Sequence, residues 1–263
     1  MTETKESNSV NFPIELCELI SGYLPILPYW VNLSDLWFGQ LSENPMAIPL
    51  LIENFDRIDW WHFSGNSHPQ AVRILENNLD KVNWRKMSGN SGAVHLLEKH
   101  IDKIDWNMAS GNVNAIPLLE KNMKNINWFN LSGNTAGVPL LERFPNRIVW
   151  SQASKNPGMI RMIETNLNEV NWEYLSENSA ALHLLFANMD KINWIRFSKN
   201  TNPLAINYLE EHPEKIDWCN FSRNSGAMHV LEKNKNKVIP FELSGNTGLF
   251  TWRNAVTEML YDI

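Results

Sequence analysis

Apolar residues recur along this chain with the spacing of short amphipathic helices. The segment 114–134 is representative, and its first part places five apolar residues on one helical face: Ala115, Ile116, Leu118, Leu119 and Met123. A second apolar pair, Trp128 and Leu131, follows one helical turn apart. The pattern predicts two short helices, at about 115–122 and 128–132, separated by a bend.

The pattern repeats, and a Ser-x-Asn triplet marks each unit. The triplet occurs ten times, beginning at Ser42, Ser64, Ser88, Ser110, Ser132, Ser154, Ser176, Ser198, Ser222 and Ser244. Seven of the nine steps are 22 residues long and two are 24. A short fixed period is typical of arrays in which each unit buries its apolar face against its neighbours. We therefore expect an all-α fold, an elongated α-solenoid of about ten helix-turn-helix units over residues 38–246.

Proline and Asn positions indicate where the helices begin and end. Proline at 49, 117 and 139 is tolerated in the first turn of a helix, and the 24-residue units bring in Pro69 and Pro203 at a longer helix start. An Asn at the end of the first helix, such as Asn122, suits a left-handed C-cap. Asp or Asn directly before a Trp predicts an N-cap of the second helix at seven positions: Asp59, Asn83, Asp105, Asn127, Asn171, Asn193 and Asp217.

A leucine-rich-repeat-like solenoid is the alternative fold, because its period and its Leu-x-x-Asn ending are similar. That repeat needs an apolar strand residue five positions before the Asn. Here the position holds residues as different as Arg85, Asn107 and Glu173. The pattern therefore favours helical units.

The segments outside the array predict a disordered leader and two end caps. Residues 1–11 are polar, and residues 12–37 form either an N-terminal cap or an F-box-like segment. Residues 247–263 predict a C-terminal capping helix with apolar residues at helical spacing: Phe250, Trp252, Val256, Met259 and Leu260. Such caps cover the last apolar face of an open array.

Composition narrows the function classes. The chain has 263 residues and a net charge of −6, which gives no electrostatic reason to bind nucleic acid or an anionic membrane. Its 12 tryptophans follow from the repeat, since a Trp stands four residues before the Ser in eight units: Trp60, Trp84, Trp106, Trp128, Trp150, Trp172, Trp194 and Trp218. Base stacking by this ladder would need a basic groove. We expect the tryptophans to fill the gaps between units instead.

A basic residue three positions before the Trp predicts a solvated surface, paired with acidic neighbours. It occurs as Arg57, Lys81, Lys103, Arg147, Lys191, Lys215 and Lys237. A second, acidic stripe comprises Glu76, Glu98, Glu120, Glu142, Glu164, Glu210 and Glu232.

The residue pattern predicts no enzyme, cofactor or metal site. A Ser nucleophile requires an adjacent base, and the ten Ser residues have no recurring His or acidic partner. His95, His183 and His229 fall in separate units and cannot share one metal ion. Cys17 and Cys219 lie far apart, so an intracellular location without disulfides is expected. No signal peptide or membrane-spanning segment is predicted, and we expect a monomer.

The two positions after each Trp vary most and face away from the predicted core. Positions that the fold leaves free can specify a partner, and aromatic and Arg side chains are common in binding hot spots. The candidate protein-binding residues are Trp61, His62, Arg85, Lys86, Phe129, Asn130, Glu173, Tyr174, Ile195 and Arg196. A drifting, functionless surface is the alternative.

Two resemblances add expectations about function. The unit Ala-Ile-x-Leu-Leu-Glu-x-Asn, followed by Trp-x-x-Leu-Ser-x-Asn, resembles tandem repeats in proteins encoded by giant DNA viruses of algae and amoebae. The N-terminal segment resembles the opening of an F-box, and its matching residues imply binding to the adaptor of a ubiquitin ligase: Phe12, Pro13, Leu16, Ile20, Leu24 and Pro25. The expected functions are a non-catalytic scaffold that binds a protein, a ubiquitin-ligase substrate receptor, or a structural part of a virion. The expected location is host cytoplasm or virion.

Overall fold

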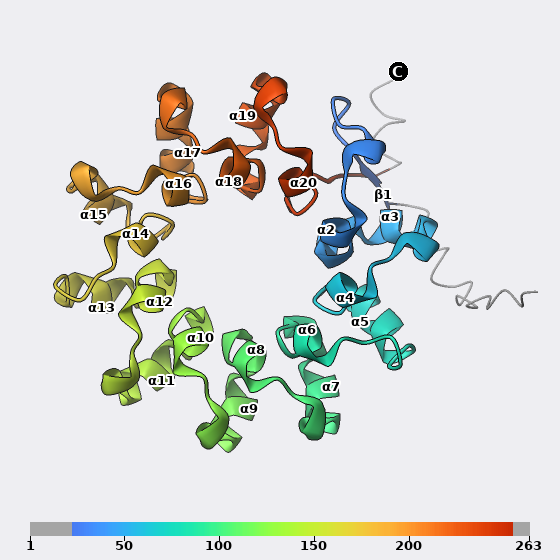
Figure 1. Cartoon of the computed structure of the whole chain (residues 1–263), viewed down its shortest axis with the longest axis horizontal. Coiled ribbons are helices and arrows are strands. Elements are labelled where there is room, and N and C mark those ends of the chain that lie inside the picture. Colours follow the sequence, from blue (N-terminus) through green and yellow to red (C-terminus); the bar gives the residue numbers. More distant parts are fainter. Residues whose placement is uncertain (1–22, 255–263) are drawn as a thin grey trace, which may run out of the picture.

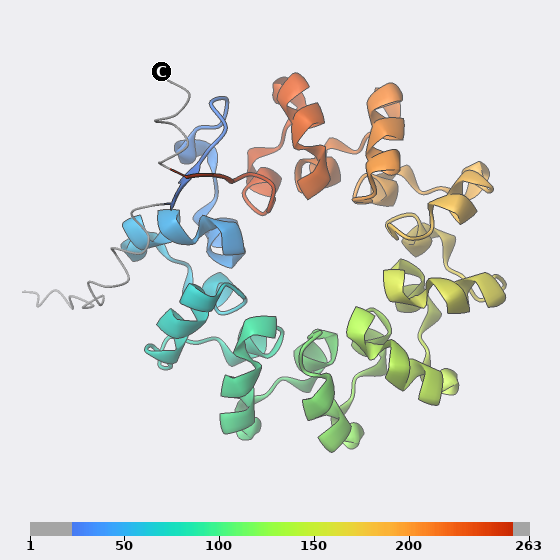
Figure 2. The same ribbon diagram turned by 180° about the vertical axis from the view of Figure 1, so that it is seen from behind.

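The repeats form two concentric rows of short helices arranged as a ring. The computed structural model describes the backbone of residues 23–254 and the side chains of residues 27–250. Figure 1 shows an inner row that surrounds a central opening and an outer row that forms the rim. Figure 2 shows the same two rows from behind. The prediction of an α-solenoid built from helical repeats is confirmed.

Within the described residues the ten units contribute ten inner helices and nine outer helices, because no outer helix follows α20. The inner helices are α2 (Phe38–Glu43), α4 (Trp60–Phe63), α6 (Trp84–Ser88), α8 (Trp106–Gly111), α10 (Trp128–Ser132), α12 (Trp150–Lys155), α14 (Trp172–Leu175), α16 (Trp194–Phe197), α18 (Trp218–Ser222) and α20 (Pro240–Leu243). The outer helices are α3 (Ile48–Glu53), α5 (Pro69–Glu76), α7 (Val94–Lys99), α9 (Ile116–Lys121), α11 (Val138–Arg143), α13 (Ile160–Thr165), α15 (Leu182–Phe186), α17 (Pro203–Glu211) and α19 (Met228–Lys233).

Single turns of 3-10 helix connect the rows. Those that precede an outer helix are η2 (Pro45–Ala47), η4 (Ser91–Ala93), η7 (Thr135–Gly137), η9 (Pro157–Met159) and η12 (Ser225–Ala227). Those that follow one are η3 (Phe55–Arg57), η5 (Ile101–Lys103), η6 (Met123–Asn125), η8 (Pro145–Arg147), η10 (Met189–Lys191), η11 (Pro213–Lys215) and η13 (Lys235–Lys237), while η1 (Leu33–Asp35) precedes the array.

The predicted helix starts are confirmed. Pro69 and Pro203 begin α5 and α17, which exceed the outer helices of the 22-residue units in length. All seven predicted N-caps accept a hydrogen bond from the backbone N–H three residues later, as Asn127 does from Asn130 at 3.0 Å. These bonds satisfy N–H groups that have no partner within the helix.

The predicted left-handed C-cap is wrong. No residue in the described backbone has a positive φ, and Asn122 has φ −131°. Its side-chain Nδ2 instead donates to the carbonyl oxygen of Leu118 at 2.9 Å, four residues back. The amide thereby takes the place of the next backbone N–H, and Asn54, Asn78, Asn166, Asn188 and Asn234 do the same. The fold therefore uses the side-chain amide donor of this Asn and does not use its tolerance of a left-handed backbone.

The apolar core is one continuous cluster that runs between the two rows. Leu118 and Leu119 of α9 and Leu131 of α10 are buried in it, and equivalent residues of the other units extend it around the ring. The eight repeat tryptophans are only partly buried and pack against its edge. Each unit therefore completes its core with residues of the next unit, as the repeat pattern predicts.

The array closes on itself, whereas the repeat pattern predicts an elongated solenoid with two separate ends. The backbone N–H of Trp37 donates to Ser244 Oγ at 2.9 Å, and Asn44 Nδ2 donates to the carbonyl oxygens of Ser244 and Asn246 at 3.4 and 3.1 Å. Units adjacent in sequence are joined by the same bonds. The last unit therefore contacts the first as though it preceded it in sequence (Figure 1).

A two-stranded antiparallel sheet lies beside this closure. Strands β1 (Tyr23–Ile26) and β2 (Thr251–Asn254) pair with Leu24 opposite Arg253 and Pro25 opposite Trp252. The predicted C-terminal capping helix is therefore wrong over residues 251–254, and its remaining residues lie outside the described range. Because the closure covers the apolar faces of the first and last units, a capping helix is not needed there.

Candidate protein-binding surface

The Ser-x-Asn triplet holds adjacent units together. All ten Ser residues are fully buried, and the ten Asn residues are exposed by at most 3%. Ser132 Oγ donates to the carbonyl oxygen of Trp128 at 2.7 Å and accepts from the N–H of Val149, in the next unit, at 2.9 Å. The hydroxyl thus bridges the inner helix of one unit and the helix start of the next.

The Asn of each triplet forms a second bridge. Asn134 Oδ1 accepts from the N–H of Ala136 at 3.0 Å, which stabilises the turn before the next outer helix. Its Nδ2 donates to the carbonyl oxygens of Ser110 and Asn112, in the preceding unit, at 3.0 and 3.1 Å. This bridge to another unit could not be identified from the sequence spacing, because the acceptors are backbone atoms 22 and 24 residues away.

The basic stripe lies over the aromatic ladder, which corrects the prediction of ion pairing. Lys215 Nζ lies 4.1 Å from the ring centre of Trp194, in the preceding unit. All seven residues of the stripe contact the preceding aromatic ring in this way, including Arg57 over Phe38, which takes the Trp position of the first unit. No ion pair involves these seven residues within the described part of the chain. Each cation lies over the face of an aromatic ring, which is a half-buried Trp in six of the seven contacts and Phe38 in the other. Such a contact is worth about 0.5–1 kcal/mol.

The acidic stripe on the outer row does form ion pairs between adjacent units. Glu76 pairs with Lys99 at 3.5 Å, and Glu120 pairs with Arg143 at 3.1 Å. Glu210 pairs with Lys233, and this contact holds the pKa of the Glu210 carboxyl below its ordinary value. The predicted pairing therefore holds for part of this stripe, since no ion pair involves Glu98, Glu142 or Glu232 within the described residues.

The positions directly after the Trp lie on the inner helices and are largely exposed. Trp61 and Phe129 are each 49% exposed, and Ile195 is 59% exposed. Arg85 and Glu173 are also exposed, although each contacts a charged residue of the next unit. The inner helices that carry these residues surround the central opening (Figure 1).

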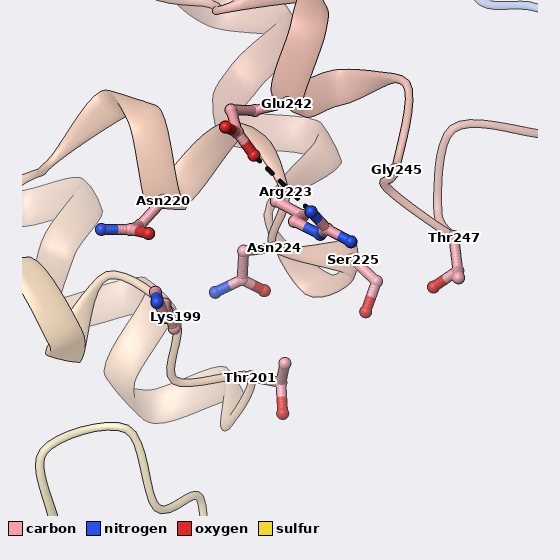
Figure 3. Close-up of a pocket in the computed structure, with 9 residues that line it drawn as sticks. All are labelled: Lys199, Thr201, Asn220, Arg223, Asn224, Ser225, Glu242, Gly245 and Thr247. Carbon is pink, nitrogen blue, oxygen red and sulfur yellow. Dashed lines mark ion pairs between the residues drawn. The ribbon is translucent and has the colours of Figure 1, made fainter. Parts of the chain in front are cut away.

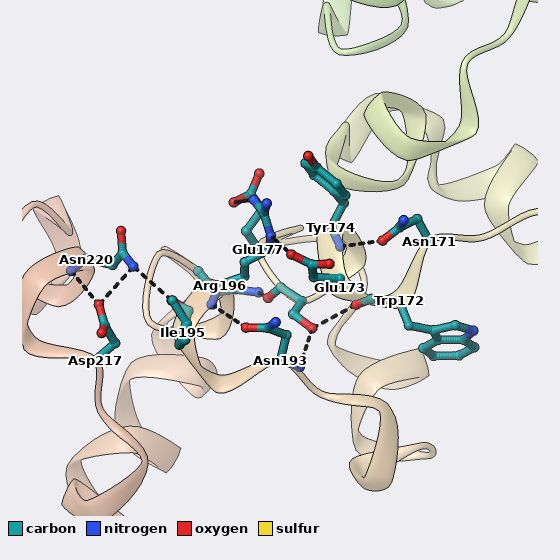
Figure 4. Close-up of polar contacts among 12 residues, drawn as sticks. Asn171, Trp172, Glu173, Tyr174, Glu177, Asn193, Ile195, Arg196, Asp217 and Asn220 are labelled. Carbon is teal, nitrogen blue, oxygen red and sulfur yellow. Dashed lines mark hydrogen bonds and ion pairs between the residues drawn. The ribbon is translucent and has the colours of Figure 1, made fainter.

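The second positions after the Trp are mostly committed to contacts between units. Arg196 Nε lies 3.0 Å from Glu173 Oε1 and its Nη1 lies 3.3 Å from Glu177 Oε2, while its guanidinium stacks 3.9 Å from the ring centre of Tyr174. Figure 4 shows Arg196 among these side chains. Burial alone would lower the pKa of Arg196, but the hydrogen bond with Glu173 and the charge of Glu177 raise it above its ordinary value.

Other second-position residues have similar partners. Asn130 Nδ2 donates to the carbonyl oxygen of Asn107 at 2.8 Å, and Lys86 Nζ lies 3.0 Å from Glu43 Oε2 and 4.3 Å from the ring centre of Trp61. His62 Nδ1 lies 3.0 Å from Asp59 Oδ2 of its own unit, and its ring lies 4.9 Å from that of Trp37, in the preceding unit. The predicted binding set therefore divides into an exposed row and a row that joins neighbouring units.

An aromatic group at the closure was not predicted. Trp37 stacks on Phe241 with ring centres 4.8 Å apart and contacts the edge of His62 at 4.9 Å. Phe241 belongs to the last unit and is 46% exposed. Trp37 and Phe241 lie more than 200 residues apart in sequence, so only the closure reveals that their rings stack.

The F-box-like residues are mostly outside the described range. Phe12, Pro13, Leu16 and Ile20 precede it, and Leu24 and Pro25 lie in strand β1. The adaptor-binding prediction therefore stays a prediction.

Within residues 23–254 no helix combines the length and apolar composition that crossing a membrane requires. In the same part of the chain, no group of three or more His, Cys, Asp or Glu side chains is arranged to hold a metal ion. Comparison with known protein families, with curated proteins and with solved structures found no match to this chain.

Proposed function

We propose that this protein is a non-catalytic scaffold that binds another protein along the inner side of its ring. The observation that carries the proposal is a set of exposed apolar side chains on four inner helices that lie two or three units apart: Trp61 on α4, Phe129 on α10, Ile195 on α16 and Phe241 on α20. Large apolar side chains that the fold does not need for its own core are typical of protein-binding surfaces. The residues beside them join the units and hold these side chains in place.

Rigidity supports the same function. The hydrogen-bond bridges of the Ser-x-Asn triplets join every unit to the next, including the last to the first. A surface that is already ordered loses little conformational entropy on binding. The ring therefore presents its exposed apolar side chains at fixed spacing to a partner that contacts several units.

The test compares partner recovery by two variants. Phe129→Ser with Ile195→Ser removes two inner apolar side chains that make no core contact, so folding should be retained and partners identified by mass spectrometry should be lost. The matched control is Leu204→Ser with Leu167→Ser, since Leu204 is the second residue of the outer helix α17, Leu167 follows the outer helix α13, and both are exposed. Equal recovery by the two variants would contradict binding at the inner side.

We further propose, from the resemblance of the repeat alone, that the protein acts in a virus-infected cell or a virion. Quantitative mass spectrometry of purified particles and infected-cell lysate tests this. Recovery at a fixed stoichiometry in particles would favour the structural role, and enrichment in lysate with a bound partner would favour the scaffold.

A further inference from the structure

A polar pocket of about 530 Å³ lies where the inner helices α16, α18 and α20 end. Three successive units line it, and each contributes the residue inside its Ser-x-Asn triplet and the residue after it. Figure 3 shows these side chains around one hollow. The lining residues used below are Lys199 and Thr201, Arg223 and Ser225, and Gly245 and Thr247.

The pocket carries two cations from adjacent units. Lys199 and Arg223 occupy the middle of consecutive triplets, a position that holds Gly in five of the ten units and Glu in two. The only other basic residue at this position is Lys155, whose neighbours in the triplet series are Gly133 and Glu177. Because most units lack a cation here, the helix ends do not require one for stability.

Arg223 is held in the pocket by its neighbours. Its Nη1 lies 3.8 Å from Glu242 Oε2, and a Cβ atom added to Gly245 would lie 3.2 Å from the guanidinium carbon. The glycine therefore leaves the space in which the guanidinium lies. In Figure 3 the guanidinium of Arg223 lies between Glu242 and Ser225.

Several donors in the pocket are uncommitted. Within the described residues, no hydrogen bond or ion pair involves the Lys199 ammonium or the hydroxyls of Thr201, Ser225 and Thr247. Two cations are present against the single carboxylate of Glu242, so the lining is positive although the whole chain has a net charge of −6.

We propose that this pocket binds the phosphate group of a phosphorylated Ser or Thr on the partner protein. A carboxylate offers two oxygens in one plane, whereas a phosphate monoester offers three acceptor oxygens and a charge of about −1.5 to −2 at neutral pH. The donors come from three units and surround the hollow from several directions, which suits the phosphate. The identity of the ligand as a phosphoprotein rests on the proposed scaffold function.

A nucleic acid is the less suitable ligand. Its backbone carries one negative charge per phosphate along an extended track, and binding it needs cations along that track. Here the two cations lie in adjacent units, and the triplet position of the unit before them holds Glu177, which is already paired with Arg196.

The test measures binding of free phosphoserine to the full-length protein by calorimetry at constant ionic strength. We expect Lys199→Ala and Arg223→Ala each to weaken binding by about tenfold or more, since each removes a charge-assisted hydrogen bond. Lys155→Ala is the matched control, because Lys155 occupies the same position in a unit without a neighbouring cation, and it should leave binding unchanged. Arg223→Lys keeps the charge and should retain part of the affinity, which separates loss of the site from loss of folding.

Three results would overturn the proposal. Phosphoserine that fails to bind the wild-type protein removes the site. Glutamate that binds as tightly as phosphoserine shows a general carboxylate site, and a single-stranded oligonucleotide that binds more tightly and with the same sensitivity to Lys199→Ala shows a nucleic-acid site. Because no partner protein is present in this assay, its outcome is independent of the partner-recovery test with Phe129 and Ile195.

Discussion

Two Asn→Ala substitutions test whether the ring is closed in solution. One removes a triplet Asn in the middle of the array, and the other removes its equivalent at the closure. Asn134→Ala removes two bonds to carbonyl oxygens of the preceding unit, at 3.0 and 3.1 Å, and one from the N–H of Ala136. The two bonds to carbonyl oxygens are buried and the bond from the Ala136 N–H is partly buried. A hydrogen bond contributes about 1 kcal/mol net, and a buried group left unsatisfied costs more. We expect the free energy of unfolding to fall by about 3–4 kcal/mol.

Asn44→Ala makes the same change at the closure. Its local bond, accepted from the N–H of Met46 at 3.0 Å, does not depend on ring closure and accounts for about 1 kcal/mol. The two bonds to Ser244 and Asn246 exist only in the closed ring. If the ring is closed, we expect a total loss of about 2–3 kcal/mol, somewhat below that of Asn134→Ala because one bond is longer.

Urea unfolding followed by tryptophan fluorescence measures both losses, with slopes compared to detect any loss of cooperativity. Asn246→Ala is the control, since Asn246 bonds to Ser222 and Asn224 within the array and should match Asn134→Ala. A loss of only about 1 kcal/mol for Asn44→Ala, beside the full loss for Asn246→Ala, would refute closure.

Three further predictions concern single side chains. Lys191→Ala should lower the free energy of unfolding by about 0.5–1 kcal/mol through the lost contact with Trp172, at 4.2 Å, and a double-mutant cycle in urea measures the coupling. Burial alone would raise the pKa of Asp59, but hydrogen bonds at the start of its helix outweigh this effect and lower the pKa below its ordinary value. The contribution of Asp59 to the free energy of unfolding is therefore present above the unfolded-state pKa and is lost as pH falls through the folded-state pKa. Asp59→Asn should flatten the acid side of the stability profile measured by thermal unfolding at several pH values. The pKa of the Cys219 thiol is raised by burial and by the carboxylate of Glu242, so alkylation of this thiol at pH 8 should be slow. The rate, followed by mass spectrometry, should increase in Glu242→Gln. An unchanged rate would show that this carboxylate has no effect on the thiol.

Local features of the repeat were predictable because their causes lie within a few residues. An Asp or Asn before a Trp reports an N-cap, and all seven such positions form the expected bond, as Asn127 does. Proline at the start of α5 and α17 follows from its missing N–H and its fixed φ. These choices depend on the backbone nearby and on no other unit.

Contacts between units were predictable only in part. The exposure of Phe129 and Ile195 follows from helical geometry, because the Trp beside each faces the core. The stacking of Lys215 on Trp194 was missed, since the acidic residues next to Lys215 in sequence suggested ion pairs there. In a repeat array the nearest residue in space is often one full period away, so neighbours in sequence mislead.

Ring closure lies beyond what the repeat pattern can establish, because it depends on the sum of many small rotations. Ten equal units that complete a circle must each turn by about 36°, and an error of about 4° per unit accumulates to more than one unit over the array. The sequence determines the surfaces that adjacent units share, whereas the rotation depends on packing details such as the half-buried position of each Trp. Once the turn brings the first and last units together, the same Ser and Asn that join every other pair of units complete the final pair. Closure therefore needs no special residues at the triplets, and this is why the sequence of the end units gives no sign of it.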